Sequence, residues 1–147
     1  MVYPSQNDWA YFAGLIDGEG SISMQRSRVS GRKSTEHFIK VQVYNTCRHV
    51  LDWLKERWGG SIRRDGTPTG ISRRQCYAWS VTGPTAAHLL EQVRPLLQIK
   101  HRQAWLALEF MQQRTVFAGK HQGVPANEQA LREGFAHAMA YLNGATT

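Results

Sequence analysis

This sequence has little cysteine, no long apolar run and no recognisable secretory leader, and each absence argues against a class of protein. Its two cysteines, Cys47 and Cys76, are too few for a disulfide framework and fit a reducing compartment. Without a CxxC pair or a cluster of cysteine and histidine, it offers no recognisable structural zinc site. Its apolar runs are too short for a membrane span, and its first residues lack the basic and apolar parts of a signal peptide. We therefore expect a soluble intracellular protein.

Length and composition favour one compact domain over residues 1–147. The chain has 147 residues, of which 41% are hydrophobic and 10% aromatic, including five Trp. Such a content is enough for a packed core and too high for a disordered chain. No repeat, low-complexity run or linker divides the sequence.

The charge is strongly positive and unevenly placed. Lys and Arg total 18 against 11 Asp and Glu, which gives a formal net charge of +7. Arginines cluster in residues 25–40 and again in residues 63–74. Because the guanidinium group bonds phosphates and guanine edges in a planar fork, these clusters favour a nucleic-acid partner. A membrane surface is the alternative, but it calls for a basic amphipathic helix, and here the basic residues lie on predicted hairpins.

Hydrophobic periodicity and turn residues predict an α+β fold. The order is α-β-β-α-β-β-α, a curved antiparallel four-stranded sheet backed by helices on one face, with a C-terminal helical extension. The core covers about residues 8–113 and the extension about 126–143. The predicted helices are 8–17, 50–58, 84–94, 100–113 and 130–143, and the predicted strands are 21–28, 36–44, 61–64 and 74–81.

The first helix has two contrasting faces. Its bulky face carries Trp9, Phe12, Leu15 and Ile16. Its small face carries Ala10, Ala13, Gly14, Asp17 and Gly18. The bulky face can enter the core of the chain, whereas small residues allow a second helix to approach closely. No second copy of the motif occurs, so we expect a two-fold homodimer with Ala10, Ala13, Gly14 and Asp17 at the contact.

Two acids, Asp17 and Glu19, end this helix. Acids at a helix C-terminus oppose its dipole and need a cation nearby, although simple solvation of the helix end is the alternative. A divalent metal such as Mg²⁺ is one such cation, since it binds carboxylate and carbonyl oxygens. A pair of such ends across a dyad would suit metal-assisted hydrolysis of two phosphates, one on each strand of a duplex.

Residues 12–20, FAGLIDGEG, resemble the nine-residue signature of the LAGLIDADG homing endonucleases, with Phe for Leu, Gly for Ala and Glu for Asp. The predicted order of elements over about residues 8–110 agrees with that family, and one copy of the motif resembles its homodimeric branch. The resemblance implies a site-specific double-strand DNA endonuclease, encoded in an intron or other mobile element. Such an enzyme cleaves a long pseudo-palindromic target by metal-dependent phosphodiester hydrolysis and leaves short 3′ overhangs. It would act in the cytoplasm of a bacterial, archaeal or phage host or inside an organelle.

The resemblance also implies roles for particular residues. Glu19 corresponds to the metal ligand, with the Gly18 carbonyl as a second ligand, and Asp17 supports the end of the helix pair. Asn45 occupies the place of a water-positioning residue, with an N-cap of the next helix as the alternative. Lys100 corresponds to the pocket cation, against the plain alternative of a surface lysine. Mg²⁺ is the implied cofactor; Mn²⁺ is expected to substitute, and Ca²⁺ to bind without supporting cleavage.

Strand parity separates the side chains that would face the major groove from those that would not. The groove-facing set is Ser23, Gln25, Lys40, Gln42, Tyr44, Ser61, Arg63, Arg74 and Cys76, with Arg28, Arg32 and Lys33 near the first hairpin's loop. Arg26, Arg64 and Arg73 have the opposite parity and are expected to contact phosphates or solvent.

A different class of function is left open by the sequence. The same fold without nuclease activity would serve as an RNA maturase or transcription factor, marked by loss of the motif acid or the pocket lysine. Glu19 and Lys100 are both present, which favours the nuclease. We expect double-stranded DNA and a second copy of the chain as partners, with no membrane and no small-molecule substrate.

Overall fold

The computed structural model describes residues 2–28, 35–68, 70, 74–116 and 123–144. The helices in this part of the chain are α1 (Gln6–Glu19), α2 (Arg48–Trp58), α3 (Gly83–Val93), a 3-10 turn η1 (Arg94–Leu96), α4 (His101–Gln113) and α5 (Ala126–Leu142). The strands are β1 (Gly20–Ser27), β2 (Glu36–Asn45), β3 (Ser61–Asp65) and β4 (Cys76–Thr82). The predicted α+β class and the order of elements are confirmed.

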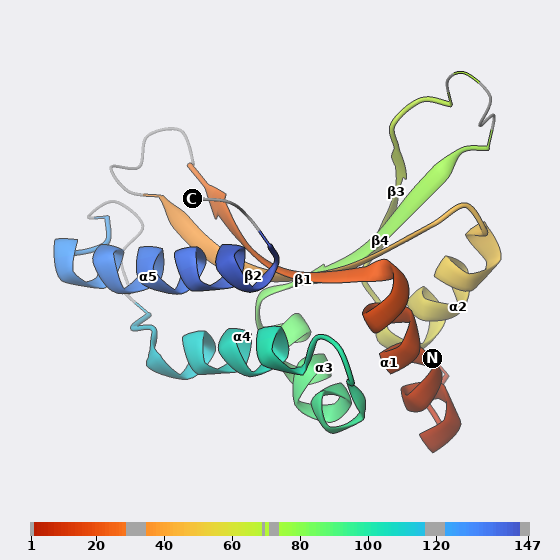
Figure 1. The fold of residues 1–147 in the computed structure, drawn as a ribbon, viewed down its shortest axis with the longest axis horizontal. Helices are drawn as coiled ribbons and strands as arrows, with labels where there is room; N and C mark the ends of the chain where they lie inside the picture. The colour runs from red at the N-terminus through yellow and green to blue at the C-terminus, as the bar shows by residue number, and fades with distance from the viewer. Residues whose placement is uncertain (1, 29–34, 69, 71–73, 117–122, 145–147) are drawn as a thin grey trace.

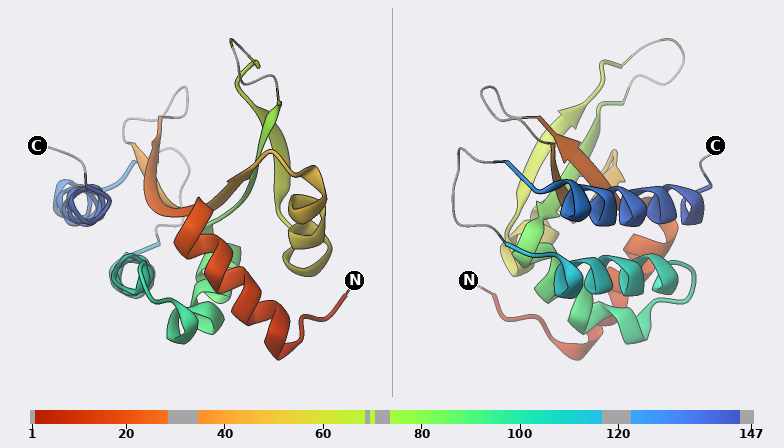
Figure 2. Two further views of the ribbon diagram at one scale, coloured as in Figure 1. Left: turned by 45° about the vertical axis from the view of Figure 1, so that its right-hand side comes forward. Right: turned by 90° about the vertical axis from the view of Figure 1, so that its left-hand side faces the viewer.

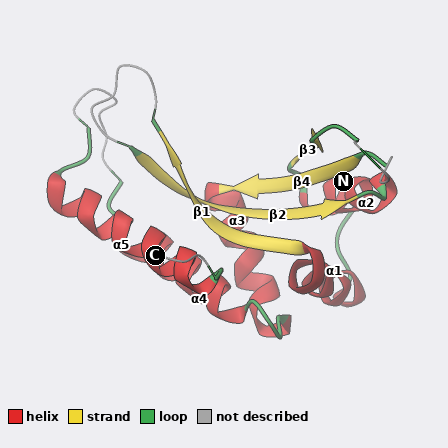
Figure 3. Cartoon of the chain, turned by 45° about the horizontal axis from the view of Figure 1, so that its top comes forward, coloured by secondary structure: helices red, strands yellow, loops and turns green. Residues whose placement is uncertain are grey.

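The four strands form one antiparallel sheet in the order β1-β2-β4-β3 (Figure 3). The sheet bends into a saddle, and the β1–β2 and β3–β4 hairpins rise on its two sides (Figure 1). Helices cover the opposite, convex side: α1 and α3 lie below the middle of the sheet, α2 below β3 and β4, and α5 beside the first hairpin (Figures 1 and 2). The saddle therefore has one concave face that the helices leave open.

The core lies between the sheet and its helices. Its largest side chains with no exposed surface include Phe12 of α1, Trp79 of β4 and Phe110 of α4. Phe12 stacks on Trp58 with ring centroids 4.3 Å apart, and the indole N–H of Trp79 donates to the Gly59 carbonyl oxygen at 2.7 Å. Burial of these aromatic rings fixes α1 and α2 under the sheet. Among the described residues, no helix combines the length and apolar character that a membrane span needs.

The helix ends differ from those that the sequence predicted. α1 starts at Gln6, two residues early, because Ser5 and Asp8 form a reciprocal capping box. α5 starts at Ala126, four residues early. Its first turns are held by Glu128, which accepts from the backbone N–H of Thr115 at 2.7 Å and pairs with Arg132 at 3.2 Å. That contact between distant segments has no local sequence signal.

The C-terminal helix α5 is fastened to β1 along its length. Arg26 of β1 makes a two-pronged ion pair with Glu133 of α5, with a shortest distance of 2.8 Å. Near the other end of α5, the Asn143 side-chain amide donates to the Ile22 carbonyl oxygen at 2.9 Å. These contacts hold the extension against the outer edge of the first hairpin.

Candidate functional site

A reciprocal set of hydrogen bonds closes the end of α1. The Asp17 carboxylate accepts from the backbone N–H groups of Gln98, Ile99 and Lys100 at 2.8, 3.2 and 3.0 Å. In return, the Lys100 ammonium donates to the carbonyl oxygens of Ile16 and Asp17, each at 2.9 Å. Lys100 thus places a positive charge at the negative end of the helix dipole, on two carbonyl groups of the last turn, of which that of Ile16 also accepts from the Gly20 N–H. We call this arrangement the Asp17–Lys100 clasp.

Glu19 and Asn45 meet beside the clasp. The Asn45 side-chain amide donates to Glu19 Oε2, while its oxygen accepts from the Cys47 N–H at 2.8 Å. Gly20 lets the chain turn from α1 directly into β1, since a Cβ there would lie 2.7 Å from the Ile16 Cα. Asn45 therefore orients the Glu19 carboxylate and also bonds the residue that precedes α2.

The exposed Glu19 carboxylate suits a hard divalent cation. One of its oxygens is held by Asn45, and Oε1 makes no hydrogen bond with the described residues. A carboxylate oxygen of this kind is the donor that Mg²⁺ and Ca²⁺ prefer. Within the described ranges, no three His, Cys, Asp or Glu side chains gather into a metal centre. Among the described residues of one chain, Glu19 is thus a lone candidate donor beside the exposed Gly18, rather than a member of a clustered set of ligands.

The small face of α1 is open at three of its positions. Ala10, Gly14 and Gly18 are exposed, and a Cβ added at either glycine would meet nothing within 4 Å. Ala13, which we expected at a contact between subunits, is instead 2% exposed inside the core of the chain. It lies at the border between the two faces of the helix, and the packing of its neighbours Phe12 and Ile16 turns it inward. Asp17 is likewise engaged within the chain.

The strand register assigns the polar side chains to the open concave face. Cross-strand pairs place Ser23 beside Lys40, and Gln42 beside Ser80, which pairs in turn with Ser61. The residues predicted to face the groove that lie on this side are Ser23, Gln25, Lys40, Gln42, Tyr44, Ser61, Arg63 and Cys76. The opposite side of the same strands carries the buried residues Ile22, Met24, Ile39, Val41 and Val43.

The remaining basic residues of the prediction are dispersed. Arg28 and Arg74 are exposed just outside β1 and β4, whereas Arg32, Lys33 and Arg73 lie outside the described residues. Arg64 is exposed on the helix side of β3, opposite Tyr77. Gln42 differs from the rest of the concave set, because it is 5% exposed and its Nε2 has no partner among the described residues.

Arg26 forms an ion pair with Glu133 on the helix side of the sheet. Its hydrogen bonds lower the pKa of Glu133 to about 2, and a contact of 3.1 Å between His37 Nε2 and Glu133 acts in the same direction. In turn, Glu133 raises the pKa of Arg26. Strand parity predicted that Arg26 contacts phosphate or solvent, and no local pattern indicates Glu133, because the two residues are 107 positions apart.

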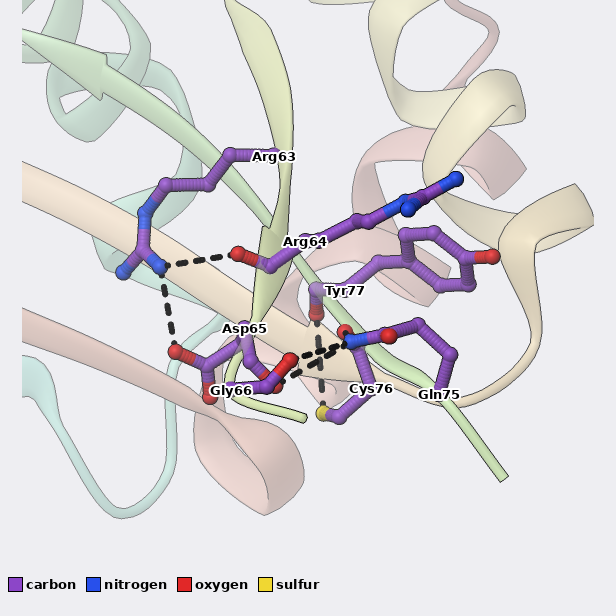
Figure 4. A network of polar contacts seen from close by, with 7 residues as sticks. All are labelled: Arg63, Arg64, Asp65, Gly66, Gln75, Cys76 and Tyr77. Carbon is purple, nitrogen blue, oxygen red and sulfur yellow. Dashed lines mark hydrogen bonds and ion pairs between the residues drawn. The ribbon is translucent and has the colours of Figure 1, made fainter. Parts of the chain in front are cut away.

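A second polar network, at the end of the β3–β4 hairpin, was also missed (Figure 4). Arg63 donates to Asp65 Oδ1 at 3.0 Å, and both side chains belong to the concave face. The Gln75 amide donates to the carbonyl oxygens of Gly66 at 2.8 Å and Cys76 at 2.9 Å, and more weakly to that of Asp65 at 3.3 Å. The spacing of two residues between Arg63 and Asp65 was the signal available in the sequence.

No protein-family model and no curated protein matches this sequence. Solved structures do match it. The homing endonuclease I-CvuI, crystallised with a DNA target and magnesium, has a TM-score of 0.71 at 20% identity, covering 97% of this chain and 85% of that one. The archaeal intron-encoded homing endonuclease I-Vdi141I, complexed with DNA, has a TM-score of 0.70 at 19% identity, covering 92% and 84%.

A third match carries the family motif in its description. It is the LAGLIDADG homing endonuclease I-SmaMI bound to cleaved DNA, with a TM-score of 0.66 at 17% identity. The match covers 90% of this chain but 43% of I-SmaMI, so this chain spans less than half of that larger protein. Helix order, sheet order and these three superpositions agree: the chain has the fold of the LAGLIDADG homing endonucleases.

Proposed function

We propose that this chain is a site-specific, metal-dependent endonuclease of double-stranded DNA that acts as a homodimer. The observation that carries the proposal is the position of the Glu19–Asn45 contact. It lies where α1 passes into β1 and where β2 ends, at the border of the open concave face, with the Asp17–Lys100 clasp beside it. The carboxylate–amide contact and the clasp that holds the Lys100 ammonium thus both lie at the C-terminal end of α1, next to a basic surface.

The concave face is the proposed DNA-binding surface. Its strands carry Gln25, Lys40 and Arg63, with Arg28 and Arg74 at the strand ends. Arginine and glutamine can bond guanine and adenine edges in the major groove, and any of the cations can bond phosphates. The structural neighbours I-CvuI and I-Vdi141I were both solved on DNA, which supports this assignment.

A second copy of the chain would complete the active centre. The described part of one copy offers one exposed carboxylate at the end of α1, that of Glu19, whereas cutting both strands needs a site for each. The open small face around Gly14 and Gly18 would let two α1 helices cross closely. A two-fold axis there would bring two Glu19 side chains together over the centre of the target.

Glu19, with the neighbouring Gly18 carbonyl, would hold Mg²⁺, which supplies charge stabilisation at the phosphate and an activated water when bound. Asn45 keeps the Glu19 carboxylate oriented. The ammonium group of Lys100 has three N–H donors, of which two are used within the clasp, so one is left for water or phosphate. We propose that Mn²⁺ substitutes for Mg²⁺ and that Ca²⁺ supports binding without cleavage. The chain would act in a compartment that holds DNA, the cytoplasm or an organelle interior.

The test is selection followed by cleavage. Duplexes would be selected by binding from a randomised library in Ca²⁺. The selected duplex would then be exposed to Mg²⁺ with wild type, Glu19→Gln, and Glu91→Gln as a control at an exposed position of α3. We expect wild type and the control to cut both strands and leave short 3′ overhangs, while Glu19→Gln binds without cutting. If wild type binds the selected duplex but cuts it with neither Mg²⁺ nor Mn²⁺, the chain is instead an inactive nucleic-acid-binding protein. If no sequence is enriched, the proposal is wrong.

A further inference from the structure

Arg63 and Asp65 form a charged pair on the concave face with unused bonding capacity. Arg63 uses Nη1 to donate to Asp65 Oδ1 at 3.0 Å and to the Arg64 carbonyl oxygen at 3.4 Å (Figure 4). Its Nε and Nη2 groups, and the second carboxylate oxygen of Asp65, make no hydrogen bond with the described residues. Both side chains are accessible, 53% for Arg63 and 38% for Asp65.

The hairpin end that carries the pair is held in shape by Gln75. Its amide nitrogen bonds backbone carbonyls on both sides of the hairpin, those of Gly66 and Cys76, and contacts that of Asp65 (Figure 4). Asp65 is also paired with Cys76 in the strand register. A ligand would therefore meet a charged pair whose backbone is already ordered, which lowers the entropy lost on binding.

The mixed charge of the pair argues against a simple phosphate contact. A phosphate would accept from Arg63, but it would be repelled by the Asp65 carboxylate at hydrogen-bond distance from that guanidinium. The major-groove edge of a base pair presents acceptors and a donor side by side. Guanine offers the N7 and O6 acceptors, and its partner cytosine offers the N4 amino donor next to O6. Arg63 and Asp65 match this order of groups.

We propose that Arg63 and Asp65 together read one G·C base pair in each half of the DNA target. The inference rests on the proposed function and adds a specificity determinant to it. The free Nε–Nη2 edge of Arg63 donates to guanine N7 and O6, and Asp65 accepts from the cytosine amino group. The hydrogen bond to Asp65 also orients the guanidinium plane of Arg63, and the same bond holds the Asp65 carboxylate in position.

The test compares base preference, measured in Ca²⁺ on the duplex selected from the randomised library. Each G·C position of that duplex is replaced in turn by A·T, and affinities are measured for wild type, Arg63→Lys and Asp65→Asn. One replacement per half-site should weaken wild type by about tenfold or more, the usual range for a paired base contact. Each variant should reduce that preference to less than about threefold while binding the replaced duplex as well as wild type does.

Arg64→Lys provides the matched control, since Arg64 is the exposed neighbour on the opposite face of β3. Its base preference should equal that of wild type, and thermal unfolding of all variants would confirm that they are folded. If Arg63→Lys and Asp65→Asn weaken every duplex equally, or keep the wild-type preference at every position, the reading pair is refuted while the endonuclease proposal stands. If wild type enriches no sequence, both fail.

Discussion

The Asp17 carboxylate and the Lys100 ammonium each bond the backbone at the other residue, so the end of α1 and the start of α4 are locked together across 83 positions of sequence. Neither side chain pairs with the other side chain in this arrangement; each binds peptide groups instead. We expect these bonds to hold in place the last turn of α1, which carries Glu19.

Replacing Asp17 by Asn should therefore destabilise the fold. An amide keeps one acceptor oxygen but loses the charge that strengthens three hydrogen bonds, and we expect the free energy of unfolding in urea to fall by about 2 kcal/mol. Asp52→Asn is the matched control, since Asp52 forms only an exposed pair with Arg48 and should cost less than about 0.5 kcal/mol. Equal losses for the two variants would contradict a structural role for the clasp.

Replacing Asn45 by Ala should slow cleavage by about tenfold, because the Glu19 carboxylate loses the amide that orients it. Asn45→Asp should slow cleavage further, since a second carboxylate at this distance repels Glu19. The measurement is the single-turnover cleavage rate in Mg²⁺. Asn127→Ala, on the exposed start of α5, is the control and should cleave at the wild-type rate. A wild-type rate for Asn45→Ala would show that Asn45 does not position Glu19.

The Arg26–Glu133 pair should make stability depend on pH in acid. The pKa of Glu133 is about 2 in the folded chain against an ordinary value of 4.5, so its contribution is complete above pH 4.5 and is lost as the pH falls towards 2. Because the Glu133 side chain is 35% exposed, solvent screening limits the contribution to about 1 kcal/mol.

The measurement is urea unfolding of wild type and Glu133→Gln at several pH values. Other carboxyl groups titrate in both proteins, so the difference between the two curves isolates Glu133. We expect wild type to be more stable above pH 4.5 and the difference to shrink as the pH is lowered. A difference that stays constant from pH 6 to pH 3 would mean that the ion pair does not persist in solution.

Gly14 offers a test of the proposed homodimer. A glutamine there has open space within one chain and improves helix propensity by roughly 0.5–1 kcal/mol, so the single chain should remain folded. Its bulk should prevent the close approach of two α1 helices, and sedimentation should show loss of self-association together with loss of double-strand cleavage.

Gly134→Gln is the corresponding control on α5, where an added Cβ also meets nothing within 4 Å. It should gain helix propensity in the same way and leave both self-association and cleavage unchanged. Dimers of Gly14→Gln that still cut both strands would place the subunit contact elsewhere.

Local sequence patterns predicted which side chains share a face of the sheet. Polar and apolar residues alternate with a period of two along a strand, which assigned Lys40 and Arg63 to the open face, and the strand register agrees. Helical periodicity predicted the faces of α1 less accurately. Ala13 lies between the two faces of α1, and the packing of a complete core decided its direction.

Contacts between distant segments were beyond sequence reasoning. Nothing near Asp17 shows that its carboxylate binds the backbone of residues 98–100, and nothing near Arg26 shows that Glu133 lies beside it. Roles for Glu19, Asn45 and Lys100 at the end of α1 were expected only through the resemblance to a known family. The metal and catalytic roles of these residues stay predictions.

The contacts between α5 and β1 also affect how open the edges of the sheet are to another strand. β1 is an edge strand whose outward carbonyl at Ile22 is taken by Asn143, so a foreign strand finds that bonding position occupied. The opposite edge, β3, has only five residues and carries Arg63, Arg64 and Asp65. Short length and charge both discourage strand addition there. Each edge of the sheet therefore carries a feature that disfavours pairing with a strand of another molecule.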